Sequence, residues 1–531
     1  MSDATSPVPA APPAPVRAVE PLLLLVCVGL SALGAMIGMQ LIVSLGISAN
    51  TAIVGALLAM LFARIPLAIT RRFRVLERQN LVQTAISSAT FGAANSLMIP
   101  IGVPYAMGMP ELALPMLIGA TLAMFVDATM LYRLFGSRVF PASAAWPAGV
   151  ATAEAIWAGD QGGRKAGFLG LGMLVGVVGS WFSIPMSAFG AAFLGNIAAL
   201  AMFGLGLLAR GYSMPLFGLD IAQAYIPHGL MIGAGLVALG QVVREVRGAR
   251  QETAAADGSG PQARQTRRIL GGGFIVYVLI ALLISLGAGH ATEMSPGMLL
   301  VFVLFAAFAA YAHELIVGIA AMHSGWFPAF AVALITLTIG MMIGFPPSAL
   351  AVLAGFSAAT GPAFADMGYD LKTGYLLRGE GRDMAQELAG RRQQYIAALV
   401  GFAVAAGVVV LFSQMFFSRH LVPPVDKVYA ATIQAGGSAE IARQLALWTL
   451  PGALLQWWGG SRRQLGILLS TGMLIFSPLA GWAVLVALAL RLALLRWRGQ
   501  RDSAQLSAFA GGVIAGDALF SFLGSVTHLR K

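Results

Sequence analysis

Long apolar runs alternate with short polar segments along almost the whole chain. A helix needs about 20 apolar residues to cross a membrane, and runs of this kind recur from residue 22 onward. The candidate spans are 22–46, 50–69, 80–103, 112–135, 141–158, 166–186, 187–210, 222–246, 269–289, 295–312, 314–340, 346–365, 396–417, 444–458, 464–490 and 506–526. The pattern therefore predicts an all-α polytopic membrane protein with about 14 to 16 transmembrane helices, of which 141–158 and 444–458 are the weakest candidates.

Short matches between the two parts of the chain indicate an internal repeat. The segment QNLV at 79–82 is similar to HELI at 313–316, and each stands before a predicted span. Repeats of this kind are typical of secondary transporters, whose substrate sites lie between the halves. We therefore divide the chain into a disordered tail at 1–20, a first transmembrane half at 21–246, a cytoplasmic linker at 247–268 and a second half at 269–531.

Composition agrees with a membrane protein and gives its expected orientation. Hydrophobic residues make up 58% of the chain and charged residues only 10%, whereas soluble domains carry about 25% charged residues. The net charge is +11, but the basic residues lie in short loops, which is the positive-inside pattern rather than a nucleic-acid-binding surface. Because 71–78, 244–268 and 372–392 are basic, we expect an integral protein of the cell (inner) membrane, in contact with lipid, with a cytoplasmic N-terminus.

The stretch at 361–394 is the strongest candidate for function. There an apolar segment runs directly into five polar or charged residues, Asp366, Asp370, Lys372, Thr373 and Tyr375. Ionisable groups at membrane depth normally face a cavity or each other, and they are functional candidates for that reason. The alternative is a solvated loop that starts just past the membrane edge, since long side chains can extend to the surface.

A polar face runs along the third predicted span. Asn80, Thr84, Ser88 and Asn95 follow one another at helical spacing, and Gln83 lies beside them. Such a stripe on a lipid-spanning helix must face protein or water. Hydrogen bonding between helices and a substrate-lining role are both open from the sequence.

Four carboxylates lie within apolar segments and are the candidates for proton coupling: Glu154, Asp127, Glu314 and Asp517. An isolated carboxylate is costly in such surroundings unless it is protonated or paired. An ion pair with Arg133 or Arg164 is the alternative role for Glu154.

Histidine can also change its charge near neutral pH. His323 is therefore a further candidate, together with His313, although a lone histidine on an apolar face is more often a hydrogen-bonded core residue.

The spacing of residues along the chain does not match the motifs of the enzyme and nucleotide-binding classes considered next. A zinc protease would carry H-E-x-x-H, but His313-Glu314 is followed by Leu315, Ile316 and Val317. The chain has no C-x-x-C site, Walker A motif or G-x-S-x-G turn, so we predict no metal site, no cofactor and no enzyme activity. The alternative is a membrane-embedded transferase acting on a lipid-linked substrate through His313 and Glu314. It would need large extracytoplasmic loops, of which 418–443 is the longest candidate.

Four segments together resemble the oligopeptide transporter (OPT) family, which includes the yellow stripe-like metal-chelate carriers. They are LERQNLVQTAISSA (76–89), FPASAAWPAGVATAEAIWAG (140–159), FADMGYDLKTGYLLRG (364–379) and AGGVIAGDAL (510–519). The DLKTGYLL match is the specific one. Ala148 and Tyr369 depart from the family pattern at polar positions, so the chain resembles a divergent member of bacterial type.

The resemblance implies a proton-coupled symporter for small oligopeptides or metal–chelate complexes. A zwitterionic substrate would pair with Asp370 and Lys372 in a cavity between the halves, and protons would enter through Glu154 or a nearby carboxylate. The expected substrate-binding residues are Asn80, Gln83, Thr84, Asp370, Lys372, Thr373, Tyr375 and His323. Many carriers of this size pair, so a homodimer is one expected arrangement.

Overall fold

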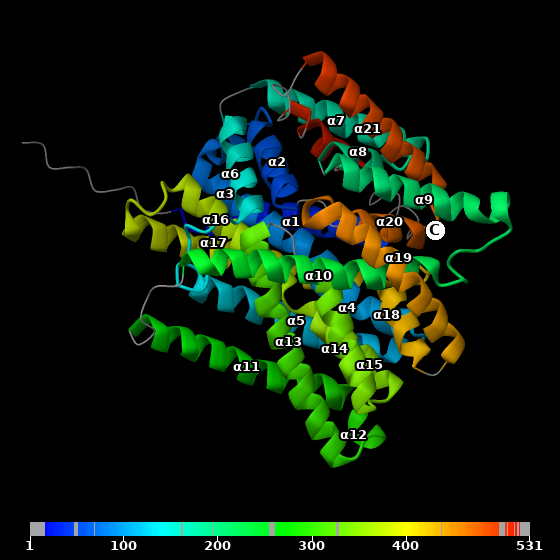
Figure 1. Ribbon diagram of the computed structural model, residues 1–531. Helices are drawn as coiled ribbons and strands as arrows, with labels where there is room; N and C mark the ends of the chain where they lie inside the picture. The colour runs from blue at the N-terminus through cyan, green and yellow to red at the C-terminus, as the bar shows by residue number, and fades with distance from the viewer. Residues whose placement is uncertain are drawn as a thin grey trace, which may run out of the picture.

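The computed structural model describes residues 16–46, 51–67, 69–160, 163–194, 196–253, 261–324, 329–436, 438–498, 505–506, 508–514, 516–517 and 520. Within these ranges the chain is helical, and its one β-type contact is an isolated bridge between Phe135 and Phe140. Nine helices in the described part are long and apolar enough to cross a membrane, and four shorter apolar helices accompany them. The predicted all-α polytopic membrane fold is confirmed (Figure 1).

In the described residues, the first part of the chain forms ten α-helices and three short η helices. They are α1 (Pro21–Leu45), α2 (Thr51–Arg64), η1 (Thr70–Arg74), α3 (Leu76–Phe91), η2 (Gly92–Met98), α4 (Ile99–Ala106), η3 (Pro110–Leu112), α5 (Ala113–Leu134), α6 (Pro147–Asp160), α7 (Gly163–Trp181), α8 (Met186–Leu194), α9 (Ile197–Phe217) and α10 (Ile226–Thr253).

The second part forms eleven further helices in the described residues. They are α11 (Pro261–Gly287), α12 (His290–Glu293), α13 (Pro296–Ser324), α14 (Ala329–Ile343), α15 (Pro347–Ala359), α16 (Pro362–Leu377), α17 (Met384–Phe417), α18 (Pro424–Ala435), α19 (Ala439–Arg463), α20 (Leu465–Leu474) and α21 (Pro478–Arg498).

Several predicted spans differ from the helices. The run at 187–210 divides into α8 and α9, because Asn196 caps α9 by accepting a hydrogen bond from the backbone N–H of Ala199. The run at 464–490 divides before Pro478, which begins α21. The predicted break at residue 313 is wrong, since α13 continues through it to Ser324. An apolar run alone does not distinguish one long helix from two short ones that pack together.

The expected domain boundaries stay a prediction, but the two predicted halves pack closely against each other. A Cβ at Gly233 on α10 would lie 1.8 Å from the carbonyl oxygen of Thr449 on α19, so only glycine allows this approach. Within the predicted linker, α10 extends to Thr253 and α11 begins at Pro261. Residues 254–260 and residues 1–15 of the predicted tail lie outside the described part of the chain.

Basic segments gather at one end of the molecule. Arg78 forms an ion pair of 2.7 Å with Glu20, close to the start of α1. The backbone N–H of Ala18 donates a 2.9 Å hydrogen bond to Gln393 on α17. The N-terminal segment and the basic segments at 71–78 and 372–392 therefore lie together, as the positive-inside pattern requires of loops that share one side.

Candidate functional site

Helix α16 carries the polar stretch through the interior of the protein. It begins after Gly361, whose φ of 95° ends α15 and turns the chain. Every residue from Pro362 to Gly374 is buried. The alternative of a solvated loop is therefore wrong, because the polar side chains lie among helices rather than beyond the membrane edge.

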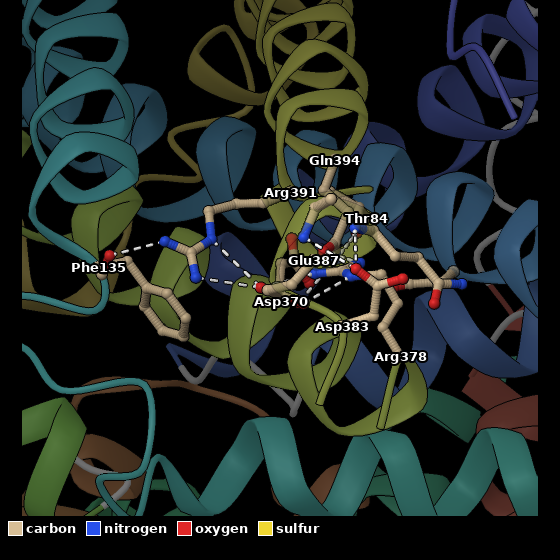
Figure 2. A network of polar contacts seen from close by, with 11 residues as sticks. Thr84, Phe135, Asp370, Arg378, Asp383, Glu387, Arg391 and Gln394 are labelled. Atoms are coloured by element: carbon tan, nitrogen blue, oxygen red, sulfur yellow. Dashed lines mark hydrogen bonds and ion pairs between the residues drawn. The ribbon is translucent and has the colours of Figure 1, made fainter. Parts of the chain in front are cut away.

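Asp370 and Gln394 belong to a hydrogen-bond network that joins α16, α3 and α17 (Figure 2). Gln83 on α3 donates to its Oδ1 at 2.6 Å, and Ser88 donates to its Oδ2 at 3.4 Å. From α17, the Nε2 of Gln394 lies within hydrogen-bonding distance of the Asp370 carbonyl oxygen (2.8 Å), Asn80 Oδ1 (3.0 Å) and Thr84 Oγ1 (3.2 Å). The predicted polar stripe thus contacts protein.

Asp366 lies one turn before Asp370 and faces the same helix. Ser87 on α3 donates a 2.9 Å hydrogen bond to its Oδ1. Its Oδ2 is buried and has no hydrogen-bond partner among the described residues. Two carboxylates therefore lie on one face of α16, against the polar face of α3.

Lys372 and Thr373 lie toward α6 and the segment before it. Lys372 Nζ donates a 2.9 Å hydrogen bond to the carbonyl oxygen of Ala142 and lies 5.4 Å from the ring centroid of Tyr375. Thr373 Oγ1 donates to the carbonyl oxygen of Gly149 at 3.0 Å. Residues two apart on a helix do not face each other, so the expected clamp of Asp370 and Lys372 on one substrate does not form in this conformation.

The end of this network contains a buried ion cluster that the sequence analysis did not identify. Glu387 on α17 is 0% exposed and pairs with Arg378 (2.8 Å) and with Arg391 (3.1 Å). Arg378 also donates to Gln394 Oε1 at 2.7 Å, and Arg391 donates to the carbonyl oxygen of Phe135 at 2.8 Å (Figure 2). This cluster ties the turn between α16 and α17 to the end of α5.

A second group of buried acids surrounds the junction of α15 and α16. Asp127 on α5 accepts hydrogen bonds from the Tyr277 hydroxyl (2.5 Å) and the Gly361 backbone N–H (2.6 Å). Glu314 on α13 lies close enough to Asp127 and Tyr277 to interact with both, and both of its carboxylate oxygens are buried. Both acids are therefore interior groups at one junction, as their apolar sequence context suggested.

His313 supports the same junction from α13. Its Nδ1 lies 2.5 Å from the Thr360 carbonyl oxygen, and its Nε2 lies 2.9 Å from the Ala329 carbonyl oxygen. Both ring nitrogens thus contact backbone acceptors, which is the hydrogen-bonded core role that the sequence left open. His323 lies in the last turn of α13, and its side chain is outside the described part of the structure.

Two of the expected proton carriers, Glu154 and Asp517, lie away from the junction of α15 and α16. Glu154 is exposed, so its expected burial is wrong. Helix α6 packs through Ala153 and Ile156, both 0% exposed, and this turns Glu154 outward. Asp517 is half-buried and accepts a 2.6 Å hydrogen bond from Ser180 on α7. Of the four candidates, Asp127 and Glu314 are the pair that the fold brings together.

A cavity of about 190 Å³ lies where helices of both predicted halves end. It is lined by Ile42, Gly46, Asn95, Ile99, Met231, Gly235, Ala329, Phe330, Ala331, Ala358, Pro362, Pro423, Pro424, Val425, Tyr429, Ile467 and Thr471. Of the expected substrate-binding residues whose side chains the structure describes, none is in this lining. Asn95, which the polar stripe did include, belongs to the π-helical segment η2, and such segments are frequent at functional sites.

Helix α18 was missed by the sequence analysis, although it forms one wall of this cavity. Its Val425 and Tyr429 line the cavity, and neighbouring Asp426 is buried with neither carboxylate oxygen hydrogen-bonded to a described residue. A Cβ at Gly102 would lie 2.0 Å from Asp426 Oδ2, so this glycine makes room for the carboxylate. The signal in the sequence was Pro423-Pro424, which begins the helix, followed by an amphipathic run too short for a membrane span.

Comparisons with known proteins agree with this architecture. The sequence model of the family described as OPT oligopeptide transporter protein matches residues 22–243 and 223–528, which together cover nearly the whole chain. No curated protein and no solved structure matches the chain. Because the family match extends over far more than half of the sequence, this membrane protein belongs to the oligopeptide transporter family.

Proposed function

We propose that the protein is a proton-coupled symporter for small oligopeptides or metal–chelate complexes. The substrate would pass through the cavity of about 190 Å³ lined by Asn95 and Tyr429, which we call the central cavity. The observation that carries the proposal is the position of this cavity among broken helices. In secondary transporters, substrate sites typically lie at the interface of the two repeats, where discontinuous helices end near the middle of the membrane. Here the lining includes the start of α16 at Pro362, the start of α18 at Pro424 and Gly46 after α1.

The lining chemistry suits a ligand with an apolar body and a carboxylate. Most of the wall is aliphatic, aromatic or proline, and Asn95, Tyr429 and Thr471 supply the polar side chains. The starts of α16 and α18 contribute the positive ends of two helix dipoles, which favour an anionic group. Peptides and organic metal chelates both carry carboxylates, so this chemistry fits either substrate class.

The small volume of the cavity indicates that the structure shows a conformation in which the binding site is contracted. Binding sites for small molecules usually enclose about 300–1,000 Å³, whereas this cavity measures about 190 Å³. A peptide therefore requires the walls to separate. In this proposal the cavity expands when the two halves move relative to each other, as alternating access requires.

Buried carboxylates supply the proposed coupling. Asp127, Glu314, Asp366, Asp370 and Asp426 are all 0% exposed, and within the described ranges none of them forms an ion pair. An isolated ionised carboxylate in an apolar interior is costly enough that the group is normally neutralised. Protons are the simplest neutralising ions, and proton relays in transporters use acids of this kind.

The junction of α15 and α16 connects the acids to the cavity. Ala358 and Pro362 line the cavity on either side of the junction, and the Gly361 N–H between them donates to Asp127. Protonation of Asp127 weakens this charge-assisted bond, because a neutral carboxyl group is the poorer acceptor. We propose that this change releases the start of α16 and lets the cavity wall move.

The transferase alternative loses its support. His313 is 0% exposed and both of its ring nitrogens contact backbone carbonyl oxygens, while Glu314 is fully buried beside it. Catalytic groups must reach the atoms of a substrate, and neither residue lines a cavity described here. The segment 418–443 contains α18 and the start of α19 rather than a large loop.

Uptake into proteoliposomes tests the proposal. The purified protein is reconstituted with an imposed pH gradient, and radiolabelled di- and tripeptides and ferric chelates are offered in parallel. We expect one class to accumulate, and the accumulation to disappear when a protonophore removes the gradient. Uptake that ignores the gradient would remove the coupling, and no uptake of either class would remove the substrate assignment.

A variant of the cavity wall links uptake to this site. Ala358→Leu adds bulk to the lining at a position that is 6% exposed. We expect the variant to show a raised KM or no uptake. A thermal unfolding temperature equal to that of the unmodified protein would show that its fold is intact.

A further inference from the structure

We propose that a groove between α5 and α11 binds an anionic phospholipid, with its headgroup at Arg133 and Arg268 and an acyl chain along the two helices. Figure 1 shows α11 along the outer edge of the molecule, next to α5. The groove is separate from the central cavity and shares no lining residue with it. The proposal therefore does not depend on the transport mechanism.

The groove is large, open and mostly apolar. It encloses about 600 Å³ and is lined by Leu122, Phe125, Val126, Thr129, Met130, Arg133, Arg268, Ile269, Gly272, Gly273, Val276, Leu279, Ile280 and Leu283. Leu122 and Leu279 at its rims are 41% and 59% exposed. Thr129 does not make the wall polar, because its hydroxyl already bonds to Phe125 and to Tyr395.

The length of the groove matches one leaflet of a membrane. Along α5 it extends from Leu122 to Arg133, and eleven residues of helix span roughly 17 Å. The hydrocarbon core of a bilayer is about 30 Å thick, so the groove is about one leaflet deep. Its two arginines lie at one end, where a lipid chain that fills the groove would carry its headgroup.

Glycine gives the groove its depth. Gly272 lines it, and a Cβ at this position would have no heavy atom within 4 Å. Gly271 is equally free of neighbours but does not line the groove. The first carbon of a larger side chain at 272 would therefore meet no protein atom and would enter the groove, where the lipid chain would lie. The same change at 271 is equally free of contacts but lies outside the groove lining.

The charge at the end of the groove selects an anionic headgroup. Arg133 and Arg268 are exposed, and among the described residues neither guanidinium forms a hydrogen bond or an ion pair. Among the described residues that line the groove there is no carboxylate. Guanidinium groups bind phosphate oxygens in bidentate geometry, and basic pockets between helices on the cytoplasmic side suit lipids with net negative charge.

Thermal unfolding with defined lipids tests the proposal. The full-length protein in a neutral detergent is titrated with dioleoyl phosphatidylglycerol, with tetraoleoyl cardiolipin, and with dioleoyl phosphatidylcholine as the zwitterionic comparison. Inorganic phosphate and glycerol phosphate form two further arms. A ligand of the native state raises the unfolding temperature, so we expect the anionic lipids to raise it, phosphatidylcholine to raise it much less, and the two soluble phosphates to have no effect.

Matched variants separate specific binding from general lipid contact. Each arginine contributes about fivefold to binding at an anionic surface, so R133Q with R268Q is expected to weaken phosphatidylglycerol binding roughly 25-fold. R267Q removes one charge outside the lining and serves as the control. G272L is expected to abolish the shift, and G271L to retain it.

Three outcomes would overturn the proposal. Equal stabilisation by phosphatidylcholine and phosphatidylglycerol would show contact with bulk lipid only. An unchanged shift in G272L would place the lipid elsewhere. A dimer in native mass spectrometry that G272L dissociates without any lipid effect would assign the groove to a second copy of the chain.

Discussion

Asp127→Asn is the substitution that tests the coupling proposal most sharply. The aspartate accepts two hydrogen bonds, from Tyr277 at 2.5 Å and from the Gly361 N–H at 2.6 Å. Asparagine keeps one acceptor oxygen, which can face Gly361, and its amide group can donate to the Tyr277 oxygen. The side chain stays hydrogen-bonded but can no longer release or take up a proton.

The expected loss of stability is moderate. Charge-assisted hydrogen bonds contribute about 1.5–3 kcal/mol and neutral ones about 0.5–1.5 kcal/mol, so Asp127→Asn should cost about 2–3 kcal/mol for its two bonds. Asp127→Ala would leave two buried donors without partners, each at about 1–3 kcal/mol. The alanine variant therefore tests folding, and the asparagine variant tests function.

Two transport assays on the same proteoliposomes separate coupling from binding. In the asparagine variant we expect substrate exchange across the membrane without a gradient to continue, and accumulation driven by the pH gradient to disappear. Glu154→Gln is the control, because Glu154 is exposed, and it should retain both activities. Accumulation in Asp127→Asn equal to that of the unmodified protein would refute the reasoning, as would the loss of accumulation in Glu154→Gln alone.

Three further predictions concern the groups around α16 and one loop. Lys372→Met removes the hydrogen bond to the Ala142 carbonyl oxygen and should cost about 1–3 kcal/mol of stability, measured by thermal unfolding; an unchanged unfolding temperature would contradict a structural role for this bond. Gln394→Ala leaves several buried partners unsatisfied and should lower stability by at least about 3 kcal/mol, seen as a loss of folded protein; an unchanged unfolding temperature would contradict the network. Burial tends to raise the pKa of Asp220, but backbone N–H groups of the loop and Arg210 lower it overall below its usual value. The stability from Asp220 is therefore present above about pH 4 and lost as the pH falls below it, so Asp220→Asn should destabilise at neutral pH and have no effect in acid, in unfolding curves across pH.

The polar face of α3 shows what periodicity can predict. The spacing of Asn80, Thr84 and Ser88 assigned them to one face of a membrane-spanning helix, and that face is buried. The spacing could not name the partner, because Gln83 bonds to a carboxylate 287 residues away. Contacts of this separation depend on how helices pack, and apolar runs carry little information about packing.

Burial of single acids was harder to predict than the presence of helices. Glu154 and Asp127 have similar apolar surroundings in the sequence, yet one is exposed and the other is 0% exposed. A helix that is apolar on all sides gives no signal of which face meets other helices. The central cavity escaped prediction for a related reason: α18 is only 12 residues long, which is too short for a search based on membrane spans.

Substrate protection of a cysteine in the cavity is the most direct test of the central claim. The single natural cysteine, Cys27, is 1% exposed. For the test it is replaced by serine, and a new cysteine is introduced at Asn95 in a variant that still transports. If peptides or chelates bind in this cavity, the transported substrate should slow thiol labelling at position 95 with the same concentration dependence as transport. Labelling that stays unchanged at saturating substrate, while a cysteine at Asn80 or Gln83 becomes protected, would contradict the account and place the substrate in the network around Asp370.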